Sequence, residues 1–334
     1  MSEGSTGTIK GQPGGGGRDR IGLLELAWQV TSALPRAERV ALALRLIETE
    51  AEEITFRREG TRWTAFPWDH MISQSLFVHG NFQGPEVQAV LAWMTRHQRI
   101  AAARNIVVDV GANIGTSAIP FALASDCRVV AIEPVPETFA VLCRNVTDNG
   151  LAPRVTCIQA AISAARADRI RMILPAGNGG GGEVHHPGRA PTFSGRNPVR
   201  GMVDVPAMAL DKLLDIHGIA PERVAFVWSD TQGCEAEVTG TGRRLWAAGV
   251  PLFAEFDPGT WDNGNGVEAL LAAATGCFVG FVVAKTLIAH PTAKARPIAE
   301  LADFCRAIGP EGSDALLLPG GFEFPADAVR PPHA

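Results

Sequence analysis

From residue 106 onward, short apolar runs alternate with stretches of helical periodicity. The runs NIVVDV, RVVAIEP and RVTCIQAAIS each predict a buried strand, and TSAIPFALA and PETFAVLCRNVTDNG predict the helices that connect them. Strands that are apolar throughout and alternate with helices are typical of a parallel sheet covered on both faces. The pattern therefore predicts an α/β domain.

The same pattern returns after an interruption at 175–201. That segment is rich in glycine and proline, which predicts a long mobile loop. Beyond it, strands are expected in VDVPAMAL, VAFVWSD, VPLFAEFDP, FVGFVVA and DALLLP, with helices between them. The total is about seven strands in one α/β domain over residues 61–325.

The N-terminal region has a different pattern. Residues 1–20 are rich in glycine, serine and charge, which predicts a disordered tail. Over 21–60 apolar residues recur at helical spacing, and Pro35 is suited to begin a helix. We expect a helical extension that packs on the larger body, with a dimerisation element or a lid as the alternative. In 61–105, TRWTAFP and SQSLFVHG predict short strands before a helix near Glu86–His97.

Composition limits the possible partners. Of the 334 residues, 46% are hydrophobic and 19% charged, which is enough apolar material for a large core, and the net charge of −5 with no basic stripe gives no reason to expect nucleic acid. The six cysteines are scattered without a C-x-x-C pair, so we expect buried thiols and no zinc site. No apolar run is long enough for a bilayer, and residues 1–20 lack the apolar core of a signal peptide, so we expect a cytoplasmic protein that makes no membrane contact.

The first turn with chemical content is VVDVGANIGTS, residues 107–117. A dinucleotide-binding turn would place glycines at positions 111, 113 and 116, but this chain has Gly111, Asn113 and Thr116. No Walker A sequence follows, so the turn is poorly suited to a pyrophosphate. We expect Gly111 to let a ligand approach the backbone and Gly115 to let the next helix pack closely on the strand.

Two acids point to the kind of ligand. Asp109 stands directly before the glycine turn, where a carboxylate would repel a pyrophosphate but suits a cation. Glu133 ends the second strand, where a carboxylate accepts hydrogen bonds from both ribose hydroxyls. Dinucleotide enzymes also use such an acid, but S-adenosylmethionine carries a sulfonium and an ammonium group and no phosphate. Asp109 together with Glu133 and the missing glycines therefore favours S-adenosylmethionine as the cofactor.

These segments, together with VPAMALDKLLDIHGI and SDTQGCEAEV, resemble in order and spacing the FkbM family of S-adenosylmethionine-dependent methyltransferases over roughly residues 73–285. The most specific parts are the GANIGT turn and the D-x-x-G-x-E element at 230–235. The resemblance implies the Rossmann-like class I methyltransferase fold, a seven-stranded, mostly parallel sheet whose last strand is antiparallel. It also implies O-methylation of a small-molecule, sugar or carrier-bound intermediate in secondary-metabolite or glycan biosynthesis.

One segment departs from the family pattern. Relatives commonly have K-I-D-V-E-G where this chain has W-S-D-T-Q-G, so that Trp228 and Gln232 replace a cation and a carboxylate. Both changes fall near the expected reaction centre.

Three residues are candidates for the chemistry. Asp230 closes the strand VAFVWSD and by resemblance lies close to the transferred methyl group, although it could instead cap the next helix. Glu255 ends the neighbouring strand, and with Asp230 and Glu235 it could bind Mg²⁺, but a polar rim is the favoured alternative and no metal ligand is assigned. His186 lies in the glycine-rich loop, which could bring a histidine base over the site, or it could simply be exposed.

The remaining cofactor contacts follow from the fold. Asn113 supplies turn backbone near the methionine part, Pro134 shapes the exit after Glu133, and Ala161 ends the third strand where such folds present small residues to the adenine. Asp211 is expected to cap the helix KLLDIHGI. Alternatives to O-methylation are an N-methyltransferase, an NAD(P)-dependent oxidoreductase and a non-catalytic cofactor-binding module. A homodimer is compatible with the sequence.

Overall fold

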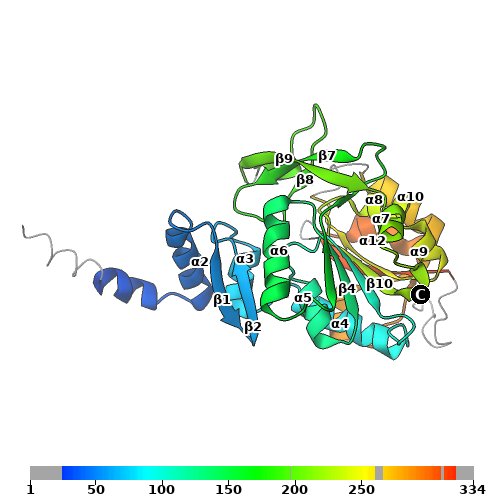
Figure 1. Cartoon of the computed structure of the whole chain (residues 1–334), viewed down its shortest axis with the longest axis horizontal. Helices are drawn as coiled ribbons and strands as arrows, with labels where there is room; N and C mark the ends of the chain where they lie inside the picture. The colour runs from blue at the N-terminus through cyan, green and yellow to red at the C-terminus, as the bar shows by residue number, and fades with distance from the viewer. Residues whose placement is uncertain (1–24, 196, 260–265, 310–311, 321–334) are drawn as a thin grey trace, which may run out of the picture.

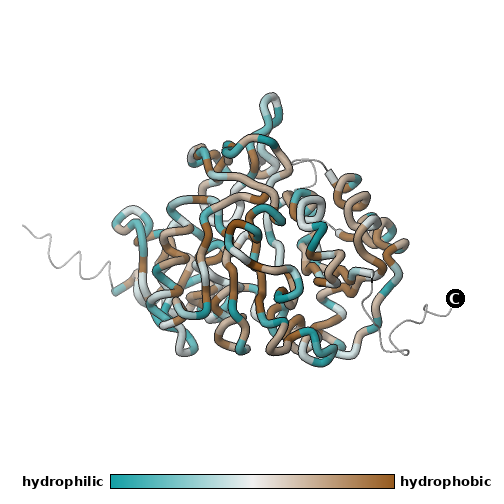
Figure 2. Tube along the Cα trace, turned by 45° about the vertical axis from the view of Figure 1, so that its right-hand side comes forward, coloured by the Kyte–Doolittle hydropathy of each residue, from teal (hydrophilic) through white to brown (hydrophobic). Residues whose placement is uncertain are grey.

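The structure of the chain is a computed structural model that describes residues 25–195, 197–259, 266–309 and 312–320. The predicted disordered tail 1–20 lies outside these residues. Figure 1 shows a central sheet between two layers of helices, with the N-terminal segments to one side. In Figure 2 the apolar stretches gather along the strands in the middle of the molecule, and hydrophilic stretches form much of its outer turns.

The central sheet has eight strands in the order β13-β12-β14-β11-β10-β3-β4-β5. Their bounds are β3 Ile106–Val110, β4 Arg128–Ile132, β5 Val155–Ile158, β10 Val224–Ser229, β11 Leu252–Phe256, β12 Phe278–Val283, β13 Arg296–Pro297 and β14 Ser313–Pro319. Strand β14 is antiparallel to both β11 and β12, whereas β5, β4, β3, β10 and β11 are parallel. This is the class I methyltransferase arrangement that the sequence predicts. The predicted count of seven strands is one too low, because the two-residue β13 extends the edge.

Helices cover both faces of the sheet. One layer contains α4 Gly84–Arg96, α5 Ala118–Ala124, α6 Pro136–Asp148 and α11 Ala284–Ala289, and the other contains α7 Leu210–Ile216, α8 Glu235–Thr241, α9 Arg243–Ala247, α10 Gly266–Cys277 and α12 Leu301–Ala307. Strand β10 is buried along its whole length. Its alternate residues enter different cores, since Trp228 packs with the first layer and Val227 with the second. A strand buried on both faces is apolar throughout, which explains why periodicity identified it.

A second, four-stranded sheet lies at the top of the view in Figure 1. It has the order β6-β9-β7-β8 and consists of β6 Ala161–Ile162, β7 Arg169–Pro175, β8 Glu183–Val184 and β9 Val199–Met208. The predicted third strand RVTCIQAAIS is therefore divided between β5 and β6. The predicted loop 175–201 is also more regular than expected, because it contains β8, a 3-10 helix at Thr192–Gly195 and the start of β9.

The N-terminal extension is only partly helical. Residues 25–32 are helical and α2 runs over Arg36–Ile47, but β1 Ile54–Arg58 is a strand where the sequence predicts a continued helix. It forms a hairpin with β2 Thr61–Ala65, which the sequence predicts as a strand within TRWTAFP. The turn residues Glu59 and Gly60 both have positive φ, of 49° and 84°, as tight hairpin turns require. The segment predicted as the strand SQSLFVHG is α3 Ile72–His79. A short apolar run fits either period, and here tertiary contacts favour the helix.

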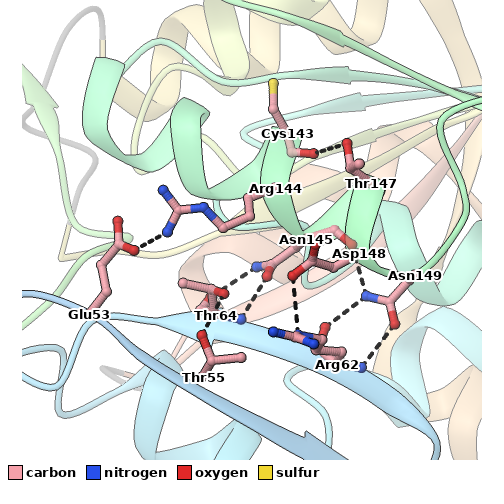
Figure 3. A network of polar contacts seen from close by, with 10 residues as sticks. All are labelled: Glu53, Thr55, Arg62, Thr64, Cys143, Arg144, Asn145, Thr147, Asp148 and Asn149. Atoms are coloured by element: carbon pink, nitrogen blue, oxygen red, sulfur yellow. Dashed lines mark hydrogen bonds and ion pairs between the residues drawn. The ribbon is translucent and has the colours of Figure 1, made fainter.

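The hairpin is fastened to α6 by two asparagines one helical turn apart (Figure 3). Thr64 N–H donates to Asn145 Oδ1 at 2.6 Å, and Asn145 Nδ2 donates back to Thr64 O at 2.9 Å. Asn149 makes the same pair of hydrogen bonds with Arg62, at 2.8 and 2.7 Å. Residues 62 and 64 face the same way on the free edge of β2, so α6 satisfies this edge as a neighbouring strand would.

Candidate functional site

Two adjoining pockets lie at the carboxyl ends of β3, β4 and β10, where ligands bind in open α/β sheets. The first encloses about 610 Å³, part of it open to solvent, between the glycine turn, the end of β4 and the small sheet. The second encloses about 880 Å³, also partly open, between the glycine turn, the end of β11 and the segment before α4. The residues that line both pockets are Gly111, Asn113, Gly180, Asp230 and Gln232.

Gly111 allows the carboxyl ends of β3 and β10 to lie in close contact. Its φ is +84°, and a Cβ atom here would lie 1.9 Å from the carbonyl oxygen of Asp230. Asp230 N–H in turn donates to Val110 O at 3.1 Å. The glycine is therefore required by the backbone of β10 as well as by its place on the pocket wall. Gly115 has the predicted packing role, because a Cβ atom at this φ of +101° would meet the side chains of Ile119 and Leu142.

Glu133 directly follows β4 on the wall of the first pocket. Its Oε2 accepts a hydrogen bond from Asn113 N–H at 3.0 Å and its Oε1 from Val135 N–H at 2.9 Å. Burial raises the pKa of this carboxyl to about 7, although the two backbone N–H groups oppose the shift. Pro134 and Ala161 line the same pocket. The first pocket is thus lined by six of the predicted cofactor residues, namely Gly111, Asn113, Glu133, Pro134, Ala161 and Asp230.

Asp109 is placed differently from the sequence expectation. It is fully buried in β3 and lines neither pocket. Its Oδ2 accepts a hydrogen bond from Ser117 Oγ at 2.6 Å, while its Oδ1 has no hydrogen-bond partner in the described part of the chain. Burial raises its pKa to about 7. Ser117 itself lines the second pocket, so this side chain stands between Asp109 and a bound ligand.

Asp230 lies where the two pockets meet. Gln83 Nε2 donates to its Oδ2 at 2.8 Å, and Gln232 Nε2 donates to its Oδ1 at 3.1 Å. Gln232 Nε2 also donates to Glu255 Oε2 at 2.9 Å. Burial, followed by the charge of Asp230, raises the pKa of Glu255 well above its ordinary value. The predicted candidates Asp230 and Glu255 are therefore brought together in the second pocket.

Glu235 supports this arrangement from behind. It is the first residue of α8, and its Oε1 accepts hydrogen bonds from both the N–H and the Oγ of Thr231 at 2.8 Å. Its Oε2 accepts from Gly233 N–H at 3.0 Å. The side chain of Glu235 thus braces the turn that presents Asp230. Asp230 does not cap α8, which resolves the alternative that the sequence left open.

Two sequence expectations are not met in this region. Asp211 does not cap its own helix. Its Oδ2 instead accepts a hydrogen bond from Arg244 N–H at 3.1 Å, in the first turn of α9. His186 lines a separate small hollow with Glu183 and Thr192, and it lines neither pocket next to Asp230. A catalytic role for His186 would need a rearrangement of its loop.

Within the ranges that the structure describes, no group of three or more His, Cys, Asp or Glu side chains is arranged as a metal site. In the same ranges no helix is long and apolar enough to cross a membrane.

Sequence reasoning missed several pocket residues. Gln83 precedes α4 and belongs to no motif. Met172 lies in β7, for which no element was predicted, and Val184 lies in β8, inside the predicted loop 175–201. These residues share a position beside the pockets, on segments that the predicted strands and helices do not include. No sequence motif identifies such residues.

The fold and the glycine turn define the class I methyltransferase type of α/β protein. Residues 109–262 match the family model described as Methyltransferase FkbM domain. The matched region includes the glycine turn, Glu133 and Asp230, and the match agrees with the resemblance that these motifs indicate. No curated protein sequence matches the chain significantly.

Several solved structures are similar to this chain. One is a TYW2 from M. jannaschii in complex with AdoMet, with 14% identity, 81% of this chain and 86% of that chain covered, and a TM-score of 0.37. Another is an O-methyltransferase from Bacillus cereus in complex with SAH, with 12% identity, coverages of 89% and 96% and a TM-score of 0.37. A third is a predicted O-methyltransferase from Agrobacterium tumefaciens, with 14% identity, coverages of 69% and 81% and a TM-score of 0.37.

Proposed function

We propose that the protein is an S-adenosylmethionine-dependent methyltransferase that methylates a hydroxyl group of an acceptor in the second pocket. The observation that supports this most is the meeting of two pockets at Asp230, one carrying the glycine turn and Glu133, the other carrying Asp230 and Glu255. A transferase needs two substrates side by side with a proton acceptor between them.

The first pocket fits the adenosine part of the cofactor. Each oxygen of Glu133 accepts one backbone N–H, which leaves a further lone pair on each for a ribose hydroxyl. Apolar side chains of Val135, Ile162 and Met172 line the same pocket and would contact the flat adenine. Among the described lining residues of both pockets there is no lysine or arginine. A pyrophosphate would find no counter-charge here, which disfavours an NAD(P)-dependent oxidoreductase.

The chemistry of the residues follows from their positions. S-adenosylmethionine, when bound, supplies a methyl group on a positively charged sulfur. Asp230 is the candidate base. It would accept the proton of the acceptor hydroxyl while the oxygen of that hydroxyl takes the methyl group. Burial and the charge of Asp230 raise the pKa of Glu255, which favours its protonated form beside Asp230. One carboxylate then carries the negative charge while the other supplies a hydrogen-bond donor.

The second pocket also bears on the acceptor. Asp230, Glu255 and Asp257 line it together with side-chain amides, and this lining suits a molecule that offers hydroxyl or amine donors and carries no anionic group. We therefore propose a neutral small molecule, sugar or carrier-bound intermediate of secondary-metabolite or glycan biosynthesis. The acidic lining equally favours an amine, which makes N-methylation the second candidate.

Calorimetric titration tests the cofactor. We expect S-adenosylmethionine and S-adenosylhomocysteine to bind with micromolar affinity, and NADPH to bind far more weakly. Failure of both sulfur ligands to bind, or tighter binding of NADPH, would refute the proposal. Transfer of a labelled methyl group can then be compared among a neutral sugar, the matching amino sugar and the matching sugar phosphate. Transfer to the sugar phosphate alone would contradict the proposed acceptor class.

A further inference from the structure

Gln83 lies outside the matched domain, in the turn between α3 and α4, yet it reaches the centre of the site. Its backbone is left-handed, with a φ of +56°. Non-glycine residues adopt this region at an energetic cost, and such residues cluster at functional sites. Of the two amides that hold Asp230, this one comes from the N-terminal part of the chain.

The side chain of Gln83 is not needed to begin the helix. Gln83 occupies the capping position of α4 but makes no side-chain capping hydrogen bond. Asn81 braces the turn instead, since its Oδ1 accepts a hydrogen bond from Gly84 N–H at 3.3 Å and its backbone oxygen accepts one from Ser75 Oγ at 2.9 Å. The side-chain amide of Gln83 thus makes no capping hydrogen bond to α4 and donates to Asp230 instead.

The two amides on Asp230 form a matched pair. Gln83 donates to Oδ2 and Gln232 donates to Oδ1, and Gln232 also has a left-handed backbone, with a φ of 54°. Two residues held at unfavourable φ thus each place one N–H donor on the same carboxylate. Donors on both oxygens fix the orientation of the carboxylate.

Asp230 needs this support because acids surround it. The pKa values of Glu235 and Asp314 are each raised to about 7, mainly by burial, and the charge of Asp230 contributes to both shifts. Glu255 is affected in the same way. A carboxylate among such neighbours is repelled by them, so hydrogen-bond donors on its oxygens help to keep it in place.

We propose that Gln83 is a positioning residue that keeps the Asp230 carboxylate aimed at the junction of the two pockets, where the sulfonium of the methyl donor would lie. The segment before the matched domain thereby completes the reaction centre. This inference depends on the proposed function, because it assigns Asp230 a place beside the positively charged sulfur.

The test compares a charged with an uncharged ligand in the full chain. S-adenosylmethionine carries the sulfonium and S-adenosylhomocysteine does not, so the ratio of their dissociation constants reports on the charge at the junction. Gln83→Gly removes the amide and relieves the left-handed backbone. Gln98→Gly is the matched control, because Gln98 is an exposed glutamine with a φ of 52° just beyond the other end of α4.

We expect Gln83→Gly to weaken S-adenosylmethionine binding roughly tenfold more than S-adenosylhomocysteine binding, the scale of one lost charge-assisted hydrogen bond. Gln98→Gly should change neither affinity, and both variants should melt at or above the wild-type temperature. Gln83→Met keeps the length and backbone strain but not the donors, so it should reproduce the loss if Gln83→Gly folds poorly.

The outcomes separate the two proposals. If the wild-type chain binds neither ligand, the proposed function fails. If it binds both and Gln83→Gly weakens them equally, or no more than Gln98→Gly does, the positioning role is wrong while the function stands.

Discussion

Gln232 Nε2 donates a hydrogen bond to Glu255 Oε2 at 2.9 Å and another to Asp230 Oδ1, so that one amide nitrogen links the two carboxyl groups. A neutral amide thus separates two acids at the position where relatives commonly have a carboxylate. Trp228, which replaces their lysine, is buried and stacks on Phe253 at 3.9 Å between ring centroids. By the resemblance to the family, one cation and one anion are replaced together here, so the net charge of this segment keeps the same balance as in relatives.

Gln232→Glu should disturb this balance. A third carboxylate between Asp230 and Glu255 adds repulsion without the cation that accompanies it in relatives. We expect a loss of about 1–3 kcal/mol in the free energy of unfolding at pH 8. At pH 5 the loss should be smaller, because the buried acids are then protonated. Urea denaturation at both pH values measures the difference, and an equal loss at both would show that repulsion is not the cause.

Gly111→Ala should displace the backbone of Asp230 at the junction of the two pockets. The new Cβ would lie 1.9 Å from Asp230 O at a φ of +84°, so the β10 end must move. Gly150→Ala is the control, because Gly150 has a φ of +69° with no heavy atom within 4 Å of a Cβ. The control should cost about 1 kcal/mol for the backbone alone, whereas Gly111→Ala should cost at least about 3 kcal/mol and abolish cofactor binding. Similar losses in both variants would mean that the close approach is unimportant.

The sequence predicts the strand ends well and their surroundings poorly. Gly111, Glu133 and Asp230 each follow an apolar strand, and the parallel order of those strands brings them to one edge without further information. Asp109 belongs to the same motif, but its burial behind Ser117 depends on how the strand packs. Gln83 reaches Asp230 only through the tertiary placement of α4. Local periodicity carries no record of such contacts between distant segments.

The predicted elements that failed share a physical reason. Strand β1, where a helix was expected, pairs with β2, and the free edge of β2 is held by Asn145 and Asn149 of α6, which lie about 85 residues later in the chain. The apolar run in α3 is short enough to match the period of a helix or of a strand, so contacts with neighbouring elements determine which one forms. Elements stabilised mainly by partners distant in sequence are those that single-segment patterns misassign.

Asn145→Ala should test how strongly α6 holds the hairpin. The change leaves Thr64 N–H, Thr64 C=O and Ile114 C=O without the hydrogen bonds that the buried amide gives them. We expect a loss of roughly 3 kcal/mol in the free energy of unfolding. Asn149→Ala removes the equivalent pair of hydrogen bonds with Arg62 at an exposed position, where water can replace them, and should cost about 1 kcal/mol or less. Chemical denaturation of both variants decides whether burial makes the difference.

Asp109→Asn should flatten the pH dependence of stability. The pKa of Asp109 is raised from 3.8 to about 7 in the folded chain, chiefly by burial. A raised carboxyl pKa means that the folded state holds its proton more tightly than the unfolded state. Its stabilising contribution is therefore complete below pH 3.8 and is lost as the pH rises through about 7.

For one group the shift corresponds to about 4 kcal/mol over that window. The asparagine cannot titrate, so the variant should gain stability relative to the wild-type chain as the pH rises from 4 to 8, although its buried amide lowers stability at every pH. Asp204→Asn is the control, since Asp204 is exposed and its pKa is lowered by Arg171. Its stability difference from the wild-type chain should not change in the same direction. A constant offset between Asp109→Asn and the wild-type chain across the range would show that Asp109 titrates alike in the folded and unfolded states.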